Sequence, residues 1–346
     1  MTAFAYELAS VLQHVERARP GQGIYALPWY LVIGEPHSGR STAIKALNLR
    51  WPYGDSPLPL STPQQLCNYW LPEKALFIEP EARVLGAQRE PDRLAELCDE
   101  LSDRRPREPI DGMLLVVSAR FLADADEDGV DRYAKSLRRY LIEVAQALSA
   151  DVPAYVLVTT YDDLWGFGDA FRWGAQRRDE EPWGFSLPPN VPQAQTPERV
   201  RLELEGLTAR IESMCFARLS TEDPPDVRTR AFQHLVEARD LLTKLGALMH
   251  IITMSNAFER SPWVRALAIG SGTPGTGHRL RHGTQFFASL GLWPPQHSGT
   301  THPGGMPIHA MLENVLLPER DLVPTRTRWR DDILFVILLI LAILTG

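Results

Sequence analysis

Short runs of consecutive apolar residues, separated by longer amphipathic stretches, dominate the pattern along the chain. Five runs have the length and composition of buried strands, and most end at a polar or glycine-rich turn. They cover residues 29–34, 75–79, 112–118, 154–160 and 264–273. Because these runs are apolar at successive positions, both faces of the resulting sheet must be covered, which is typical of a parallel sheet.

Amphipathic stretches with a period near 3.6 residues lie between the strands and predict helices. They cover residues 4–15, 41–47, 91–105, 131–150, 197–219 and 226–254. The last two include Leu202 and Phe232 among their periodic apolar positions, and they predict an antiparallel pair packed beside the sheet. Strands that alternate with helices form βαβ units, so the sequence predicts a doubly wound, mostly parallel α/β sheet with a helical insertion.

The turn after the first strand has the spacing of a phosphate loop. Glycines and a serine occupy the positions of G-x-x-x-x-G-K-[ST], with arginine in place of the lysine. Glycines let the backbone fold so that N–H groups and a helix N-terminus converge on an anion. The sequence therefore predicts a P-loop NTPase-like fold. The candidate nucleotide-binding residues of this turn are Gly34, Ser38, Gly39, Arg40, Ser41 and Thr42, with Ser41 also the candidate metal ligand.

Arg40 keeps the positive charge of the missing lysine but differs from it in shape and reach. We therefore expect binding of GTP or ATP with Mg²⁺ to be weak or absent. A glycine-rich strand-to-helix turn without any ligand is the alternative interpretation of the same spacing.

The turn after the strand at 75–79 is a second candidate corner. A phosphate-binding fold places an acid followed by a glycine near the terminal phosphate, but residues 79–83 read EPEAR. Glu79 offers a carboxylate for a metal-bound water, whereas Pro80 lacks an amide donor and Ala82 lacks the freedom of glycine. Glu81 adds a like charge that repels phosphate, so we favour a purely structural corner.

The turn after the strand at 154–160 is a third candidate corner. Thr159 and Asp162 match the guanine-reading pattern [NT]-K-x-D, but Thr160 replaces the lysine whose stem stacks on the base. Asp162 is equally suited to cap the next helix, because aspartate is a preferred capping residue. Ser271, in the glycine-rich turn after the last strand, completes the candidate nucleotide-binding set.

Composition narrows the class of protein. The 346 residues carry a formal charge of −7 at a pI near 5.8, which gives no basic footprint for nucleic acid. Cys67, Cys98 and Cys215 are odd in number and widely spaced, which fits neither a disulfide framework nor a zinc site. Residues 1–19 carry charges throughout, so we predict no signal peptide there.

The C-terminal stretch Ile333–Leu344 is a run of twelve apolar residues and indicates a membrane segment. Twelve helical residues span only about 18 Å against a hydrocarbon core of roughly 30 Å, so this span is short or unfinished. Arginines at 326, 328 and 330 favour the cytoplasmic side for the globular part. A buried C-terminal helix is the alternative.

Several of these motifs together resemble the IcmF/TssM proteins of bacterial type VI secretion. The stretch 27–34 is similar to the family's LPWY strand before its phosphate loop, and Trp183-Gly184-Phe185 follows a D-x-L-x-G-F corner as in the family. Further similarities are Ile110-Asp111-Gly112 through Ser118, Val156 to Thr159 with Asp162-Asp163-Leu164 and Gly166-Phe167, and Ser271-Gly272-Thr273.

The resemblance implies a cytoplasmic, GTPase-like domain at the inner membrane of the bacterium, part of a scaffold that anchors the secretion machine. The partners it implies are a DotU/TssL-type membrane protein, a lipoprotein and other secretion-complex subunits. The family's lysine, D-T-A-G-R corner and T-K-x-D lysine are replaced here by Arg40, residues 79–83 and Thr160. We therefore expect a degenerate structural member and not an active NTPase.

The expected domain boundaries follow from these motifs. They are an N-terminal amphipathic helix (1–22), a P-loop NTPase-like core (23–195), a helical insertion (196–260), the return of the core (261–292), a Pro/Gly-rich juxtamembrane region (293–332) and a partial transmembrane helix (333–346). The family's paired N-terminal membrane helices and periplasmic region have no counterpart here, so we expect a fragment, a truncated product or a split protein. An active GTP or ATP hydrolase and a tail-anchored regulator are the two competing hypotheses.

Overall fold

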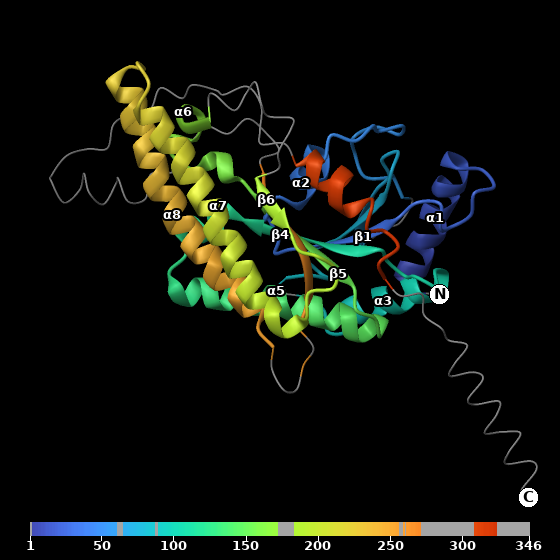
Figure 1. Cartoon of the computed structure of the whole chain (residues 1–346). Coiled ribbons are helices and arrows are strands. Elements are labelled where there is room, and N and C mark those ends of the chain that lie inside the picture. The colour runs from blue at the N-terminus through green and yellow to red at the C-terminus, as the bar shows by residue number, and fades with distance from the viewer. Residues whose placement is uncertain are drawn as a thin grey trace, which may run out of the picture.

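The protein is a layered α/β structure in which helices cover both faces of one sheet (Figure 1). The computed structural model describes residues 2–60, 65–86, 89–171, 183–255, 259, 261–270 and 308–323. The candidate Ser271 and the apolar stretch 333–344 lie outside the described residues. Within the described ranges, no helix has the length and apolar character needed to cross a membrane.

Seven strands form the sheet, in the order β2-β3-β1-β4-β5-β7-β6. The strands are β1 (Trp29–Ile33), β2 (Cys67–Trp70), β3 (Leu76–Pro80), β4 (Gly112–Ser118), β5 (Pro153–Thr159), β6 (Gly184–Ser186) and β7 (Trp263–Ile269). The five central strands are parallel, and β2 and β6 pair antiparallel at the two edges. The predicted mostly parallel α/β sheet is thus confirmed.

Helices occupy the segments between the strands. They are α1 (Ala3–Ala18), α2 (Arg40–Ala46), α3 (Arg93–Arg104), α4 (Ala119–Asp124), α5 (Glu127–Leu148), α6 (Phe167–Phe171), α7 (Thr196–Leu219), α8 (Pro225–Thr253) and α10 (His309–Met311). Short helices of other types are η1 (Tyr161–Asp163), η3 (Gln193–Gln195) and the π-helical η4 (Leu312–Leu316).

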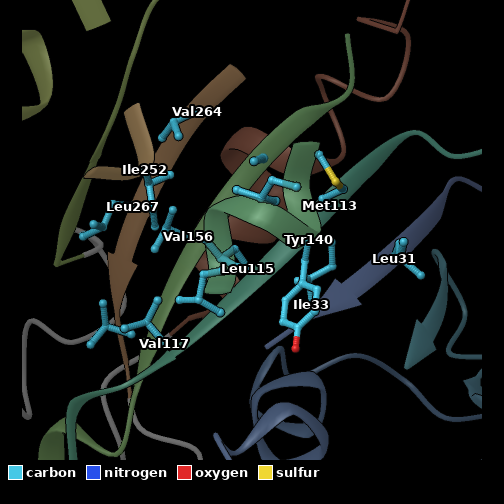
Figure 2. Close-up of a cluster of buried hydrophobic side chains, with 14 of the residues drawn as sticks. Leu31, Ile33, Met113, Leu115, Val117, Tyr140, Val156, Ile252, Val264 and Leu267 are labelled. Carbon is cyan, nitrogen blue, oxygen red and sulfur yellow. The ribbon is translucent and has the colours of Figure 1, made fainter. Parts of the chain in front are cut away.

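One face of the sheet carries the larger part of the core. Alternate residues of the central strands point to this face, where α5 and α8 cover them (Figure 2). The labelled members in that view are Leu31, Ile33, Met113, Leu115, Val117, Tyr140, Val156, Ile252, Val264 and Leu267. Since side chains of a strand alternate between faces, the consecutive apolar runs in the sequence supply both cores.

The opposite face is covered by α2 and by the segment 308–323, which lies inside the Pro/Gly-rich region expected at 293–332. The hydroxyl of Tyr30 donates to the Leu316 carbonyl at 2.7 Å, and that of Tyr155 donates to Glu319 at 3.0 Å. Glu319 also forms a partly buried ion pair with Arg265 of β7. This segment is therefore an integral layer of the fold.

The amphipathic helix expected at the N-terminus is α1, and its apolar face packs on the domain. Its Glu7 is fully buried and accepts hydrogen bonds from the amides of Leu66 (2.6 Å) and Cys67 (3.3 Å). Burial raises the pKa of this carboxyl. The helix thereby supports β2, an edge strand that the sequence pattern did not predict.

The helices α7 and α8 lie along each other beside the sheet, as expected, and α8 also packs on α5 (Figure 1). Two positions that the periodic pattern predicted to be buried are exposed, however. Leu202 is 44% exposed and Phe232 is 48% exposed, so they lie off the buried stripe. The faces that pack are lined instead by residues such as Leu207, Leu235 and Leu245.

Candidate functional site

The candidate loop connects β1 to α2, and its glycines are required by close approaches of the backbone. A Cβ on Gly34 would lie 2.8 Å from both the Val116 carbonyl and the Ser38 hydroxyl. Gly39 is the N-cap of α2 with a φ of +86°, a left-handed conformation that glycine adopts without strain. Both positions of the turn therefore require glycine.

Ser38 and Thr159 join the loop to the end of β5. The Thr159 hydroxyl donates to the Ser38 carbonyl at 2.6 Å, and a Cβ on Gly39 would lie 3.3 Å from the same hydroxyl. The hydroxyl of Ser38 is buried and has no hydrogen-bond partner among the described residues. Thr159, a candidate for the base-reading corner, thus stabilises the loop itself.

Arg40 points away from the loop, toward the end of β3. Its guanidinium is 8% exposed, and Nη1 donates to the Pro80 carbonyl at 2.7 Å. Its Nε lies 3.7 Å from the Glu79 carboxylate, with which it forms a buried ion pair. A lysine that binds phosphate must instead extend across the loop. The positive charge of Arg40 is engaged with Glu79 and Pro80 and is not directed at the loop.

Glu79 is surrounded by donors. Its carboxylate accepts from the Ser41 hydroxyl at 2.9 and 3.1 Å and from the indole Nε1 of Trp70 at 2.8 Å. Glu79 is 4% exposed, and the positive charge of Arg40 compensates its negative charge. The structure therefore brings together Arg40, Ser41 and Glu79, three of the predicted residues, through contacts with one another. Thr42 follows them in α2 and is partly exposed.

The third corner is held by helices on both sides. Asp162 lies in η1 and is 5% exposed, and it does not extend into solvent. Thr160 adopts a φ of +58°, and its hydroxyl accepts from the Arg120 amide at 3.1 Å. Arg120 in turn pairs with Asp163. A cation at the start of α4 therefore lies beside the corner where the family pattern has a lysine.

α8 packs against the same corner. His234 is fully buried, with Nδ1 at 3.0 Å from the Trp165 carbonyl and Nε2 at 3.3 Å from the Tyr161 hydroxyl. Because a carbonyl only accepts, Nδ1 donates, and in a neutral ring Nε2 then accepts from the Tyr161 hydroxyl. Burial lowers the pKa of His234 to about 4, in agreement with this assignment. Gly166 allows the backbone to pass so close that a Cβ there would lie 2.1 Å from the Arg230 carbonyl.

The site offers two oxygen-bearing side chains as possible metal ligands. No group of three or more His, Cys, Asp or Glu side chains in the described part of the chain is arranged to hold a metal ion. The Ser41 hydroxyl and the Glu79 carboxylate are the two oxygen donors that Mg²⁺ favours. The three cysteines are buried, and burial raises the pKa of each thiol, so they are structural.

Sequence patterns missed two contributors to the site. Trp70 belongs to the short edge strand β2, and Arg120 lies in the first turn of the short helix α4; each reaches the site only through tertiary contacts. Neither Trp70 nor Arg120 belongs to a local motif that marks it. A cavity of about 680 Å³ adjoins the loop, between Ser38, Arg120 and Tyr133.

Comparison with known proteins identifies relatives of the chain. The Type VI secretion system component TssM1 of Pseudomonas aeruginosa is 27% identical over 292 residues, which cover 78% of this chain and 26% of TssM1. This chain therefore spans about a quarter of the length of that curated relative.

Solved structures resemble the chain only distantly. A crystal structure of SsGBP with GDP has a TM-score of 0.25 and 12% identity, and the match covers 70% of this chain and 57% of that one. A GTP-binding protein from Sulfolobus solfataricus in complex with GDP has a TM-score of 0.22 and 12% identity, with 45% and 40% covered. Scores this low carry no argument about fold or ligand.

A family profile gives the decisive match. The profile of the IcmF-related N-terminal domain matches residues 87–344, about three quarters of the sequence. On this match, the chain belongs to the family of IcmF-related N-terminal domains.

Proposed function

We propose that the chain is a structural component of a type VI secretion system, a cytoplasmic scaffold module at the bacterial inner membrane that has lost nucleotide chemistry. Its similarity to TssM1 supports the secretion system. The proposed anchor is the apolar stretch 333–344, and the proposed partners are a DotU/TssL-type membrane protein and other subunits of the secretion complex.

A P-loop NTPase-like origin of the core is part of this proposal. β1 lies between β3 and β4, so the chain crosses to opposite sides of β1, and the candidate loop follows the carboxyl end of this strand. Ligands of open α/β sheets bind at such switch points. The strand order therefore supports an ancestral phosphate loop at residues 34–41.

The observation that carries the loss of nucleotide chemistry is the position of the Arg40 side chain. The guanidinium donates to the Pro80 carbonyl and neutralises Glu79, while Ser41 donates to the same carboxylate. The cation for a phosphate and the two oxygens for a magnesium ion are thus engaged with each other. Binding of a nucleotide would have to break a buried ion pair, which costs about 3–5 kcal/mol.

Nucleotide titration tests this proposal directly. The full chain, purified in mild detergent, is titrated with GTP and with ATP in the presence of Mg²⁺ by calorimetry. We expect no saturable binding in the micromolar range. Micromolar binding that is abolished by Gly39→Asp, which fills the loop with a side chain and a negative charge, would overturn the scaffold proposal.

An active hydrolase is the second candidate function, and it requires Mg²⁺ to displace Arg40 from Glu79 and to take the Ser41 and Glu79 oxygens as ligands. The 2.9 Å contact between these oxygens places two ligands for Mg²⁺ at the end of the loop. This candidate predicts phosphate release from GTP or ATP that requires Mg²⁺ and is lost in Ser41→Ala. Absence of release by the wild-type chain excludes it.

The third hypothesis, a tail-anchored regulator outside secretion, depends on the membrane segment and the partners. The scaffold proposal predicts that the full chain stays in the membrane fraction after a carbonate wash and co-purifies with a DotU/TssL-type protein. Membrane retention without this partner would favour the regulator.

A further inference from the structure

The outer side of the α7–α8 hairpin carries a groove of about 880 Å³ that lies apart from the candidate nucleotide site. The described residues that line it belong to these two helices and to the turn before α7. Ala209 and Gly246 give it depth, because, apart from the neighbouring backbone of α8, no described atom lies within 4 Å of the position that a Cβ on Gly246 would take. The hairpin stands beside the sheet (Figure 1), and exposed side chains such as Glu198 and Glu205 line the groove.

Three large apolar side chains extend the groove toward the turn between the helices. Phe216 is 48% exposed, Phe232 is 48% exposed and Val236 is 39% exposed. Phe216 lies seven residues after Ala209, and Phe232 and Val236 lie seven residues before the groove residues Arg239 and Thr243. Because a seven-residue step returns to nearly the same side of a helix, these side chains lie on the groove side.

The period of this pattern indicates another helix as the occupant. Apolar or small residues that repeat every seven residues on neighbouring helices form the seam of a coiled coil, into which a further helix inserts its side chains. From Phe232 to His250 the groove side of α8 covers eighteen residue steps, about 27 Å. The matching occupant is a helix of about five turns.

The size of the face argues against a stable dimer of the chain formed through this face alone. A face about 27 Å long and two helix diameters wide, about 20 Å, offers roughly 540 Å² per copy. Two such faces would bury about 1,100 Å², less than the 1,200–2,000 Å² of a typical stable interface.

The charges along the edge of the groove indicate the sign of the partner. Glu198, Glu205 and Glu212 repeat every seven residues on α7, and all three line the groove. Arg201 pairs with the first two and Arg239 with the third, so three carboxylates face two guanidiniums. The side chains of Glu198 and Glu205 are each 60% exposed and remain accessible to a further cation.

We propose that this groove binds one amphipathic helix of a partner protein, with apolar residues at seven-residue spacing and lysine or arginine along the edge that meets α7. The apolar row contacts Phe216, Phe232 and Val236 and fills the space over Gly246. The basic row contacts Glu198 and Glu205. This inference adds a partner surface to the proposed scaffold function and rests on it.

A displayed library of eighteen-residue amphipathic helices, randomised between lysine and glutamate on both edges, provides the probe. The library is selected against the full chain in mild detergent. The key variant is Gly246→Leu, which fills the groove, and the matched control is Gly206→Leu. Gly206 is also a helical glycine without a described atom near its Cβ position, but it does not line the groove.

We expect the selected helices to be rich in lysine on one edge and to bind the wild-type chain and Gly206→Leu equally. Filling the groove should weaken binding by about tenfold or more, because the leucine occupies the space that the apolar row of the helix would enter. The reversal Glu205→Lys should weaken binding of the basic helices as well.

Three results would overturn the inference. They are a selection without basic enrichment, binding that Gly246→Leu leaves unchanged, and a dimer of the chain that Gly246→Leu dissociates in light scattering, which would assign the groove to a second copy. This experiment does not measure nucleotide binding. A result that overturns the groove inference would therefore leave the proposed loss of nucleotide chemistry unaffected.

Discussion

Replacement of Arg40 by alanine should destabilise the protein, because the guanidinium is a structural partner of β3. The change removes a hydrogen bond from a charged donor to the Pro80 carbonyl, worth about 1.5–3 kcal/mol. It also leaves the 4%-exposed Glu79 carboxylate without its counter-charge. Breaking a buried ion pair costs about 3–5 kcal/mol, but the separation of 3.7 Å and the remaining donors Ser41 and Trp70 reduce this loss. We expect a total of about 3 kcal/mol.

Urea unfolding followed by tryptophan fluorescence measures the loss, with the double variant Arg40→Ala, Glu79→Gln as the control. Removing the orphaned charge should recover about 1–2 kcal/mol, which appears as a coupling energy in the double-mutant cycle. If Arg40→Ala unfolds within about 0.5 kcal/mol of the wild type, the usual range of a surface substitution, the guanidinium is not a structural partner and the reasoning is refuted.

Three further predictions concern the third corner and the pH dependence of stability. Gly166→Ala should lower the thermal midpoint much more than Gly21→Ala: both positions have a φ near +70°, but a Cβ meets the Arg230 carbonyl at 2.1 Å only at Gly166. Equal losses would show that backbone strain alone decides. Burial, together with the nearby carboxylate of Asp111, raises the pKa of Glu108 from 4.5 to about 7. The folded state therefore binds this proton more tightly than the unfolded state, and stability should fall as the pH rises from 4.5 to about 7. Glu108→Gln should flatten that fall in unfolding midpoints. The pKa of His234 is lowered from 6.5 to about 4, so its contribution is present above pH 6.5 and is lost as the pH falls toward 4. An amide-containing variant, His234→Gln, should therefore lose less stability than the wild type between pH 6.5 and 4.

The sequence alone determined the central sheet of this protein. The run at 112–118 has the bounds of β4, and the runs at 29–34, 75–79, 154–160 and 264–273 differ from their strands by at most a few residues. A strand buried on both faces must be apolar at every position, so its pattern is local and readable. The two edge strands were missed because β2 and β6 are short and of mixed polarity, and they form only where a neighbouring strand supplies hydrogen bonds.

Sequence spacing also located the candidate loop, because the glycines at 34 and 39 answer a local steric demand of the turn. What Arg40 does in this loop depends on contacts with distant parts of the chain. Arg40 contacts Pro80 and Glu79, some forty residues along the chain, and Trp70 reaches the same carboxylate from an edge strand. The direction of a long side chain is set by partners that no local pattern contains, so the chemistry of this site depends on how β2 and β3 pack against α2.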